Sequence, residues 1–207
     1  MAKINAFRTQ KGWIEVICGP MFSGKSEELL RRLNLLKFAD VKYLLFTPET
    51  DTRSGTKKAK SRDGRVIESV TVSSSREIID QINKREDVQV IAVDEAQFFD
   101  DELPEVCNYL ANNDYIVIAA GLDMDSWGRP FTPMMKLLIY AESVTKLKAI
   151  CTNCGAEASF TAHTRPRPMD SQILVGDKNE YTAYCRHCHA SSKMNYNNFT
   201  KVKKARV

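Results

Sequence analysis

The sequence predicts an α/β fold with a mostly parallel sheet, and three observations favour it. Short apolar runs typical of buried strands alternate with segments whose leucines recur at helical spacing. Proline, glycine or asparagine ends several of these segments. The alternation runs from Trp13 to about Ile150 and then stops. Strands that alternate with helices are typical of domains built on a parallel sheet.

The first half of the pattern contains apolar strands, amphipathic helices and one long polar segment. We expect, in order, a strand over 13–18, a helix over 28–38, a strand over 41–48, a mobile loop over 49–65, a strand over 66–72 and a helix within 73–85. Pro48 ends the second strand. In the last helix, Ser74 is followed three residues later by Glu77, which is the pattern of a capping box.

The second half contains two strongly apolar strands. We expect, in order, a strand over 88–95 that ends in two acids, a helix over 101–113, a strand over 115–121, a helix over 133–142 and a last strand over 143–150. Cys18 and Cys107 are isolated in the sequence, and we expect both in the core.

Composition places the chain among soluble globular proteins. It has 207 residues, 43% hydrophobic and 27% charged, which suits one domain or one domain with a small appendage. The net charge of +4 is too small to indicate nucleic-acid binding by itself. The sequence has no run of eighteen apolar residues, and its N-terminal residues lack the apolar core of a signal peptide. We therefore expect a cytoplasmic protein with neither a membrane nor a nucleic-acid partner.

The string GPMFSGKS, residues 19–26, lies between the first strand and the first helix and fits G-x-x-x-x-G-K-[ST] at each fixed position. In such a loop, backbone N–H groups converge on a phosphate and the helix dipole adds positive potential. Gly19 and Gly24 let the backbone turn and approach the ligand closely. Lys25 can reach the β- and γ-phosphates, and the Ser26 hydroxyl can bind Mg²⁺. The alternative is a chance match in a flexible turn.

Two acids at the end of the strand over 88–95 complete this pattern. Asp94 is placed to hold the Mg²⁺ that bridges the β- and γ-phosphates. Adjacent residues of a strand point to opposite faces, so Glu95 can serve instead as a base for an attacking hydroxyl or water. The alternative is an ordinary pair of solvated acids. The chain has no N-K-x-D string, which would signal guanine selection, so a GTPase is disfavoured.

Four cysteines form two C-x-x-C units about thirty residues apart, Cys151 with Cys154 and Cys185 with Cys188. Four thiolates at such a spacing can close a tetrahedral structural Zn²⁺ site and tie the segment between them into one long loop. Free thiols or a redox pair are the alternative. His187 or His189 could replace Cys188 as the fourth ligand, and we expect His163 at the surface.

The change in composition at Cys151 predicts the domain organisation. We expect a nucleotide-binding α/β domain over 1–150, a zinc-binding domain over 151–192 and a flexible tail over 193–207.

Over nearly its whole length the chain resembles the cytosolic-type (type II) thymidine kinases. The resemblance is carried by GPMFSGKS, DTR at 51–53, DEAQFF at 94–99, GLDMD at 121–125, RPF at 129–131, AESVTKLKAIC and GDKNEYTAYCRHCH. It implies a RecA-like core with a zinc-bearing lasso domain. It also implies transfer of the γ-phosphoryl group of ATP to the 5′-hydroxyl of thymidine, giving thymidine monophosphate for DNA synthesis. A homotetramer inhibited by thymidine triphosphate is expected from the same resemblance.

The resemblance also implies roles for individual residues. Glu95 is the expected base. Ser26 and Asp94 are expected to hold magnesium, directly or through water. The expected zinc ligands are Cys151, Cys154, Cys185 and Cys188. The expected ATP contacts are Gly19, Pro20, Met21, Phe22, Ser23, Gly24, Lys25, Ser26, Asp51, Thr52, Arg53, Asp94 and Gln97. The expected nucleoside contacts are Met21, Phe98, Leu122, Phe131, Leu174, Val175, Gly176 and Tyr181. For any one of the pocket aromatics, core packing is an equal alternative.

The chain departs from the family pattern directly after LDMD. The family has a phenylalanine there, whereas this chain has Ser126 followed by Trp127. Trp127 could fill the same space from the next position, and nucleoside selectivity depends on whether it does.

Two other functions remain open from the sequence. One is a P-loop ATPase that uses its zinc unit to hold nucleic acid, although residues 151–190 carry mixed charges and few aromatics. The other is a deoxynucleoside kinase of shifted specificity, for example one that accepts deoxyuridine well.

Overall fold

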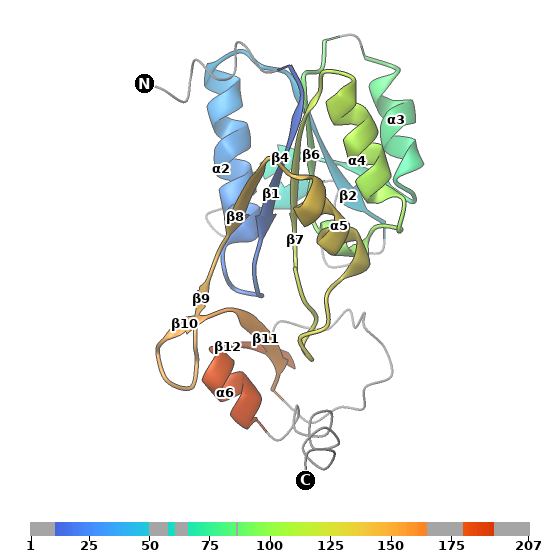
Figure 1. Ribbon diagram of the computed structural model, residues 1–207. Helices are drawn as coiled ribbons and strands as arrows, with labels where there is room; N and C mark the ends of the chain where they lie inside the picture. The colour runs from blue at the N-terminus through green and yellow to red at the C-terminus, as the bar shows by residue number, and fades with distance from the viewer. Residues whose placement is uncertain (1–10, 50–57, 61–65, 86, 165–179, 193–207) are drawn as a thin grey trace.

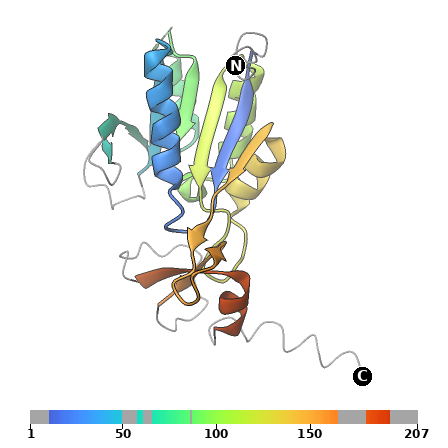
Figure 2. The same ribbon diagram turned by 90° about the vertical axis from the view of Figure 1, so that its left-hand side faces the viewer.

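The computed structural model describes residues 11–49, 58–60, 66–85, 87–164 and 180–192 (Figure 1). A large α/β unit and a small unit rich in cysteine follow one another along the chain. In both views the small unit lies beyond one end of the sheet of the large unit (Figures 1 and 2).

A six-stranded sheet forms the centre of the large unit. Its strands lie in the order β5-β2-β6-β7-β1-β8, and every pair of neighbours is parallel. Because all six strands run the same way, their carboxyl ends meet at one edge of the sheet. The strands are β1 (Trp13–Cys18), β2 (Tyr43–Pro48), β5 (Val70–Val72), β6 (Val90–Val93), β7 (Ile116–Gly121) and β8 (Ser143–Lys146).

Helices cover both faces of the sheet, as a parallel sheet requires. Alternate residues of β1 point into two separate cores: Val16 packs with α3, α4 and α5, whereas Ile17 packs with α2. The two helical layers lie on opposite sides of the strands in Figure 1. None of the helices in the described ranges combines the length and apolar character needed to cross a bilayer. The helices are α2 (Lys25–Phe38), α3 (Arg76–Ile82), α4 (Leu103–Asn112) and α5 (Thr132–Tyr140).

Cys18 on β1 and Cys107 on α4 are both buried, as the sequence predicts. Burial raises the pKa of Cys18 to about 11 and that of Cys107 to about 12. Both thiols therefore remain protonated at neutral pH and act as small apolar side chains of the core.

Two stretches expected to form single strands each divide between two sheets. Residues 66–72 form β4 (Val66–Glu68), which pairs with β3 (Lys58–Lys60), and then β5, which pairs with β2. Part of the expected loop over 49–65 is therefore a strand. Similarly, residues 143–150 form β8 in the large sheet and β9 (Ala149–Ile150) in the small unit. All residues of such a stretch favour strands, so the sequence does not show where the chain changes from one neighbouring strand to another.

The capping box expected between Ser74 and Glu77 is wrong by one residue. The Glu77 carboxylate accepts hydrogen bonds from the backbone N–H and the hydroxyl of Ser73 instead. Ser75 precedes helix α3, and its hydroxyl and N–H both donate to Asp100. The sequence has three consecutive serines and does not show which of them forms which hydrogen bond. The position of Asp100, which is distant in the sequence, makes Ser75 its partner.

Within the described residues, the small unit consists of two antiparallel strand pairs and one helix. The strands β9 and β10 (Glu157–Ala158) pair antiparallel, as do β11 (Phe160–His163) and β12 (Tyr181–Tyr184), and α6 (Arg186–Ser191) follows. Its core is small: the buried cluster consists of Ala149, Cys151, Ala158, Ala183 and Cys188. So few apolar side chains cannot by themselves stabilise an independent unit.

Candidate active site

The loop over 19–26 has the strand–loop–helix geometry that its sequence predicts. β1 ends at Cys18, and α2 begins at Lys25. Gly24 has a φ of 83° and its carbonyl accepts the first helical hydrogen bond, from Glu28 N–H at 2.9 Å. Gly19 has a φ of 146°, and a Cβ there would lie 2.4 Å from the Leu147 carbonyl oxygen. Only glycine satisfies both the dihedral angle and the close approach at this position.

Lys25 lies folded back over the loop. Its ammonium donates to the Pro20 carbonyl at 2.8 Å, and the Ser23 hydroxyl donates to the same oxygen at 2.9 Å. Burial lowers the pKa of Lys25 below its ordinary value, and the charges of Glu95, Asp94 and Asp123 offset only part of that shift. Lys25 therefore lies among carboxylates at the carboxyl edge of the sheet.

Asp94 and Glu95 follow β6 directly, and Glu95 has a backbone conformation that the sequence does not predict. The strand ends at Val93, and Glu95 takes a φ of 52°, in the left-handed region. The expected strand over 88–95 therefore stops short of Glu95, whose backbone is not extended. A non-glycine residue in this conformation is uncommon and is found preferentially at functional sites.

Asp94 is the buried member of this pair, with 8% of its surface exposed. Its carboxylate accepts the Glu95 N–H at 2.9 Å and a hydrogen bond from the Ser26 hydroxyl. Burial, followed by the charge of Glu95, raises the pKa of Asp94 to about 7. The structure thus brings Ser26 and Asp94 together, as the motif analysis expects of a magnesium site.

Gln97 links Glu95 to the next strand. Its amide nitrogen donates to the Glu95 carboxylate, and its amide oxygen accepts the Leu122 N–H at 2.8 Å. Gln97 is 2% exposed, and it lies on the short 3₁₀ turn Ala96–Phe98. A Cβ on Gly121 would lie 2.7 Å from the Gln97 amide oxygen, so the glycine makes room for this contact.

An apolar hollow lies beside this group, between the sheet edge and the small unit. Five of the residues expected to contact nucleoside line it: Met21, Phe98, Leu122, Phe131 and Tyr181. Ser126 and Trp127, where the sequence departs from the family pattern, also line it. Sequence reasoning missed the remaining residues of the lining, which are Met124, Asp125, Thr161 and His163. The Thr161 hydroxyl accepts the Met21 N–H at 2.9 Å and so joins the small unit to the phosphate loop.

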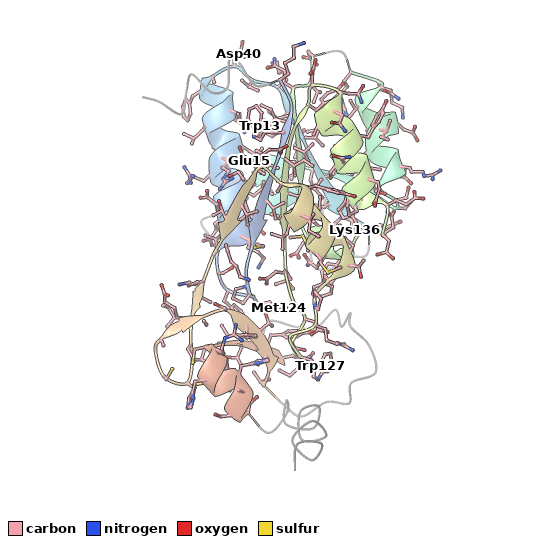
Figure 3. The ribbon with its side chains drawn as sticks, viewed as in Figure 1. Trp13, Glu15, Asp40, Met124, Trp127 and Lys136 are labelled. Carbon is pink, nitrogen blue, oxygen red and sulfur yellow. The ribbon has the colours of Figure 1, made fainter. Side chains whose placement is uncertain are left out.

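Trp127 forms part of one wall of this hollow, on the loop after β7 (Figure 3). Its ring contacts His163 edge-on, with the ring centroids 5.2 Å apart, and His163 in turn lies 4.8 Å from the Tyr181 ring. The Arg129 guanidinium lies 4.9 Å from the Trp127 ring centroid and is held by Asp125 at 2.6 Å. The expectation that His163 lies at the surface is wrong, because only 6% of it is exposed. The alternation of β11 places Thr161 and His163 on one face, and only the tertiary fold shows that this face lines the hollow.

An ion pair with one buried member also lies at the carboxyl edge. Lys146, the last residue of β8, pairs with Asp123 at 2.7 Å, and Asp123 is 5% exposed. The hydrogen bond to Asp123 raises the pKa of Lys146. Sequence reasoning did not single out this pair, because its partners lie on different strands and match no motif.

Some of the expected site residues lie outside the described ranges. They are Asp51, Thr52, Arg53, Leu174, Val175 and Gly176.

The four paired cysteines converge in the small unit. The sulfur atoms of Cys151, Cys154, Cys185 and Cys188 all lie within 4.8 Å of one another, and the Cys154 and Cys185 sulfurs are 3.6 Å apart. A tetrahedral Zn²⁺ with Zn–S bonds of about 2.3 Å requires sulfurs about 3.8 Å apart, so the set fits zinc. The Cys188 N–H holds the pKa of Cys185 below its usual value, which favours the thiolate that zinc binds.

Neither neighbouring histidine belongs to this cluster. The His189 ring is directed away from the sulfurs, with Nε2 3.1 Å from the Ser126 carbonyl oxygen. Since a carbonyl oxygen only accepts, that nitrogen must carry a proton and cannot bind a metal. His187 is exposed on α6. The four cysteines are therefore the zinc ligands that the geometry favours.

The fold and the site define a class before any comparison is made. A phosphate loop at the carboxyl edge of a parallel sheet, a buried acid beside its serine and an adjoining apolar hollow are features of a P-loop phosphotransferase that takes a small organic acceptor.

Comparison with known proteins identifies the family. The family model described as thymidine kinase matches residues 12–189, so the chain belongs to the thymidine kinase family. The thymidine kinase of Mycoplasmoides gallisepticum is 47% identical over 205 residues, covering 97% of this chain and 91% of that protein. The thymidine kinase of Ureaplasma parvum serovar 3 is 47% identical over 196 residues, covering 91% and 87%.

One solved structure was also compared. The Legionella pneumophila ATPase DotB covers 69% of this chain and 38% of its own, with a TM-score of 0.39 and 14% identity. A likeness this low carries no argument about function or fold.

Proposed function

We propose that this protein transfers the γ-phosphoryl group of ATP to the 5′-hydroxyl of thymidine, giving thymidine monophosphate and ADP. The observation that carries the proposal is the position of Met21. It belongs to the phosphate loop, lines the apolar hollow and donates its N–H to Thr161 of the small unit. A phosphate in the loop and an acceptor in the hollow would therefore be neighbours. Membership of the thymidine kinase family supports thymidine as that acceptor.

ATP would bind across the carboxyl edge of the sheet. Residues 19–26 would surround its phosphates, and Lys25 would leave the Pro20 carbonyl for the β- and γ-phosphates. Phosphate oxygens are stronger acceptors for an ammonium than a neutral carbonyl, so the exchange is favourable. Asp51, Thr52, Arg53 and Gln97 are further proposed ATP contacts, from the family resemblance.

Magnesium would accompany ATP at Ser26 and Asp94. The buried Asp94 carboxylate beside the Ser26 hydroxyl is a pair of hard oxygen donors, which Mg²⁺ prefers. When bound, the ion supplies charge that neutralises the β- and γ-phosphate oxygens. The raised pKa of Asp94 is consistent with a carboxylate whose natural partner is a cation.

Glu95 would act as the base. It would accept the proton of the thymidine 5′-hydroxyl as that oxygen forms its bond to the γ-phosphorus and the bond to the β–γ bridging oxygen breaks. Its backbone is left-handed, and its carboxylate accepts a hydrogen bond from the Gln97 amide, which restricts its orientation. Gln97 in turn holds the N–H of Leu122, a residue of the hollow. The base is therefore tied to the acceptor side of the site.

The thymine and the sugar would occupy the apolar hollow. Met21, Phe98, Leu122 and Phe131 provide apolar walls, as small-ligand sites require, and Tyr181 lies beside His163 at one side. Leu174, Val175 and Gly176 are proposed to meet the base through backbone groups. Trp127 follows Ser126, which stands where the family has a phenylalanine. Because Trp127 lines the hollow, it would supply an aromatic wall in place of that phenylalanine.

Further expectations follow from the family and remain proposals. They are a homotetramer, inhibition by thymidine triphosphate, a cytoplasmic location and the division into domains over 1–150 and 151–192 with a tail over 193–207.

The deciding experiment is transfer of labelled phosphate from Mg·ATP to thymidine, deoxyuridine and the other deoxynucleosides. Glu95→Gln is expected to lower kcat by about 10²- to 10⁴-fold while ATP binding stays within about threefold, because only proton transfer is lost. Glu105→Gln is the matched control, since this exposed acid of α4 pairs with Lys136 of α5.

Three results would contradict the proposal in different ways. Full activity of Glu95→Gln would remove the base assignment alone. Faster phosphorylation of deoxyuridine than of thymidine would shift the substrate. ATP hydrolysis with no nucleoside phosphorylated would reject the kinase activity and reopen the nucleic-acid alternative.

A further inference from the structure

Helix α6 carries two adjacent side chains with different partners. Cys188 belongs to the cysteine cluster, whereas the His189 ring contacts the loop after β7, with its Nε2 3.1 Å from the Ser126 carbonyl oxygen. Both residues are 7% exposed, so the contact is shielded from water. The helix therefore connects the cysteine cluster directly to a loop that lines the proposed nucleoside pocket.

Packing holds the His189 ring in this orientation. The ring stacks on Phe160 with centroids 4.5 Å apart and an interplanar angle of 19°. Gly128 lies against the same pair: a Cβ there would lie 3.8 Å from the His189 ring and 3.9 Å from the Phe160 ring. The stack and the glycine leave the imidazole little freedom to turn away from the Ser126 carbonyl.

The hydrogen bonds around Ser126 converge on a single peptide group. The carbonyl of Ser126 faces His189, and the N–H of the same peptide, that of Trp127, donates to the Asp125 carboxylate at 2.9 Å. One peptide plane is thus held from both sides, on one side by the small unit and on the other by its own loop. Because this plane precedes the Trp127 Cα, its orientation restricts the directions that the indole ring can take.

We infer that His189 is a positioning residue that sets the place of Trp127 in the nucleoside pocket and so links the cysteine cluster to nucleoside affinity. The inference rests on the proposed thymidine site. The donor at Nε2 is the essential part, because stacking alone would not fix the peptide plane. His189 is not itself among the residues that line the hollow, so the proposed effect passes through Ser126 and Trp127, which are.

The test compares two replacements of His189 with a control on the same helix. His189→Phe keeps the stack on Phe160 and removes the donor, whereas His189→Gln keeps a donor. His187→Phe changes an exposed residue of α6 and is the control. The expected result for His189→Phe is a rise in KM for thymidine of about 3- to 10-fold, the size of one buried hydrogen bond. The values of kcat and of KM for ATP stay within about twofold, and His189→Gln recovers most of the affinity.

A spectroscopic signal reports Trp127 itself. The chain has two tryptophans, so the measurement uses a Trp13→Phe background. His189→Phe is expected to shift Trp127 emission to longer wavelength and to increase its quenching by acrylamide, with zinc content unchanged. Normal thymidine affinity and normal emission in a zinc-loaded His189→Phe protein would overturn the inference.

An independent measurement on the unmutated protein covers the case in which the variant does not fold. With ¹⁵N-labelled histidine, His189 is expected in the Nε2–H form with a proton that exchanges slowly with solvent. A different tautomer or rapid exchange would overturn the inference. Equilibrium dialysis of thymidine against the same protein separates the two proposals, because no thymidine binding at all would reject the proposed function instead.

Discussion

The phosphate loop and the apolar hollow adjoin each other, yet different forces hold them in place. The loop joins β1 to α2, and these two elements contribute to the two cores that lie on either side of the six-stranded sheet. The hollow depends partly on β11 and β12, whose unit has a buried cluster of only five residues, two of them cysteines of the metal set. If the proposed function holds, phosphate binding would rest on hydrophobic burial, whereas acceptor recognition would rest on a unit stabilised by zinc and on individual hydrogen bonds.

This difference leads us to expect that the two activities can be separated. Changes to the cysteine cluster would affect nucleoside binding first and ATP binding little. Changes to the sheet core would instead lower global stability and leave the affinity of the folded fraction intact. The contact between Met21 and Thr161 is the point at which the two kinds of support meet.

The largest expected effect is that of zinc removal. Structural zinc contributes on the order of 10 kcal/mol to the folding of small units, so a chelator or Cys185→Ser should unfold the strand pairs around the cluster. Thymidine binding should fall by more than about 100-fold, and binding of an ATP analogue should stay within about threefold. Calorimetric titration with each ligand measures both. Zinc added back to the chelated protein is the control, and equal losses for the two ligands would contradict the separation.

A change in the large core should have the opposite pattern. Leu33 of α2 is fully buried, and Leu33→Ala should lower the free energy of unfolding by about 2–5 kcal/mol through the cavity it leaves. Leu35→Ala is the matched control on the same helix, because Leu35 is 55% exposed. Urea denaturation followed by circular dichroism gives the stability. A raised KM for thymidine in the folded Leu33→Ala protein would show that the two regions are coupled through the core.

A substitution at Gly121 tests the contact through which Gln97 links Glu95 to Leu122. An alanine Cβ would approach the Gln97 oxygen and the Met134 sulfur at 2.7 Å, so Gly121→Ala should cost about 1–3 kcal/mol of stability. The displaced Gln97 should also lower kcat, because it holds Glu95. The double variant Gly121→Ala with Gln97→Ala should recover part of the stability. Simple additivity of the two changes would mean that the clash lies elsewhere.

The smallest expected effect is a dependence of stability on pH at the surface of α2. Hydrogen bonds from Arg31 and Arg32 lower the pKa of Glu28 from its ordinary 4.5 to about 2. The folded chain therefore binds this proton less readily than the unfolded chain. The resulting stabilisation is complete above about pH 4.5 and is lost as the pH falls toward 2.

Glu28→Gln should flatten the stability profile over that range, by less than about 1 kcal/mol since solvent screens the pairs. Glu27→Gln, in the same turn, is the control, and denaturation midpoints between pH 2 and 6 provide the measurement. An unchanged slope in Glu28→Gln would assign the acid sensitivity to other carboxylates.

Several features of the site follow from local sequence alone. The spacing of Gly19, Gly24, Lys25 and Ser26 predicted the phosphate loop, and its strand and helix flank it as expected. The spacing of the four paired cysteines predicted that they come together, and the structure brings their sulfur atoms into one cluster. These predictions succeed because each depends on backbone freedom, ligand type or short spacing, all of which are properties of a few consecutive residues.

Other features required contacts between distant residues. The left-handed turn at Glu95, the place of Gln97 beside Leu122 and the burial of His163 match no local pattern. Likewise, nothing within 143–150 marks the point at which the chain leaves the large sheet for the small unit. Strand-forming residues permit both pairings, and only the available partners choose between them.

The sequence by itself determined the class of fold, the phosphate loop, the acids after β6 and the four cysteines that form the cluster in this protein. The tertiary structure alone decided how the hollow is walled and how the small unit reaches it, through Thr161 to Met21 and through His189 to Ser126. The physical reason is that propensities and motifs act over a few residues, whereas a pocket is formed by packing between segments whose separation in the chain carries no signal.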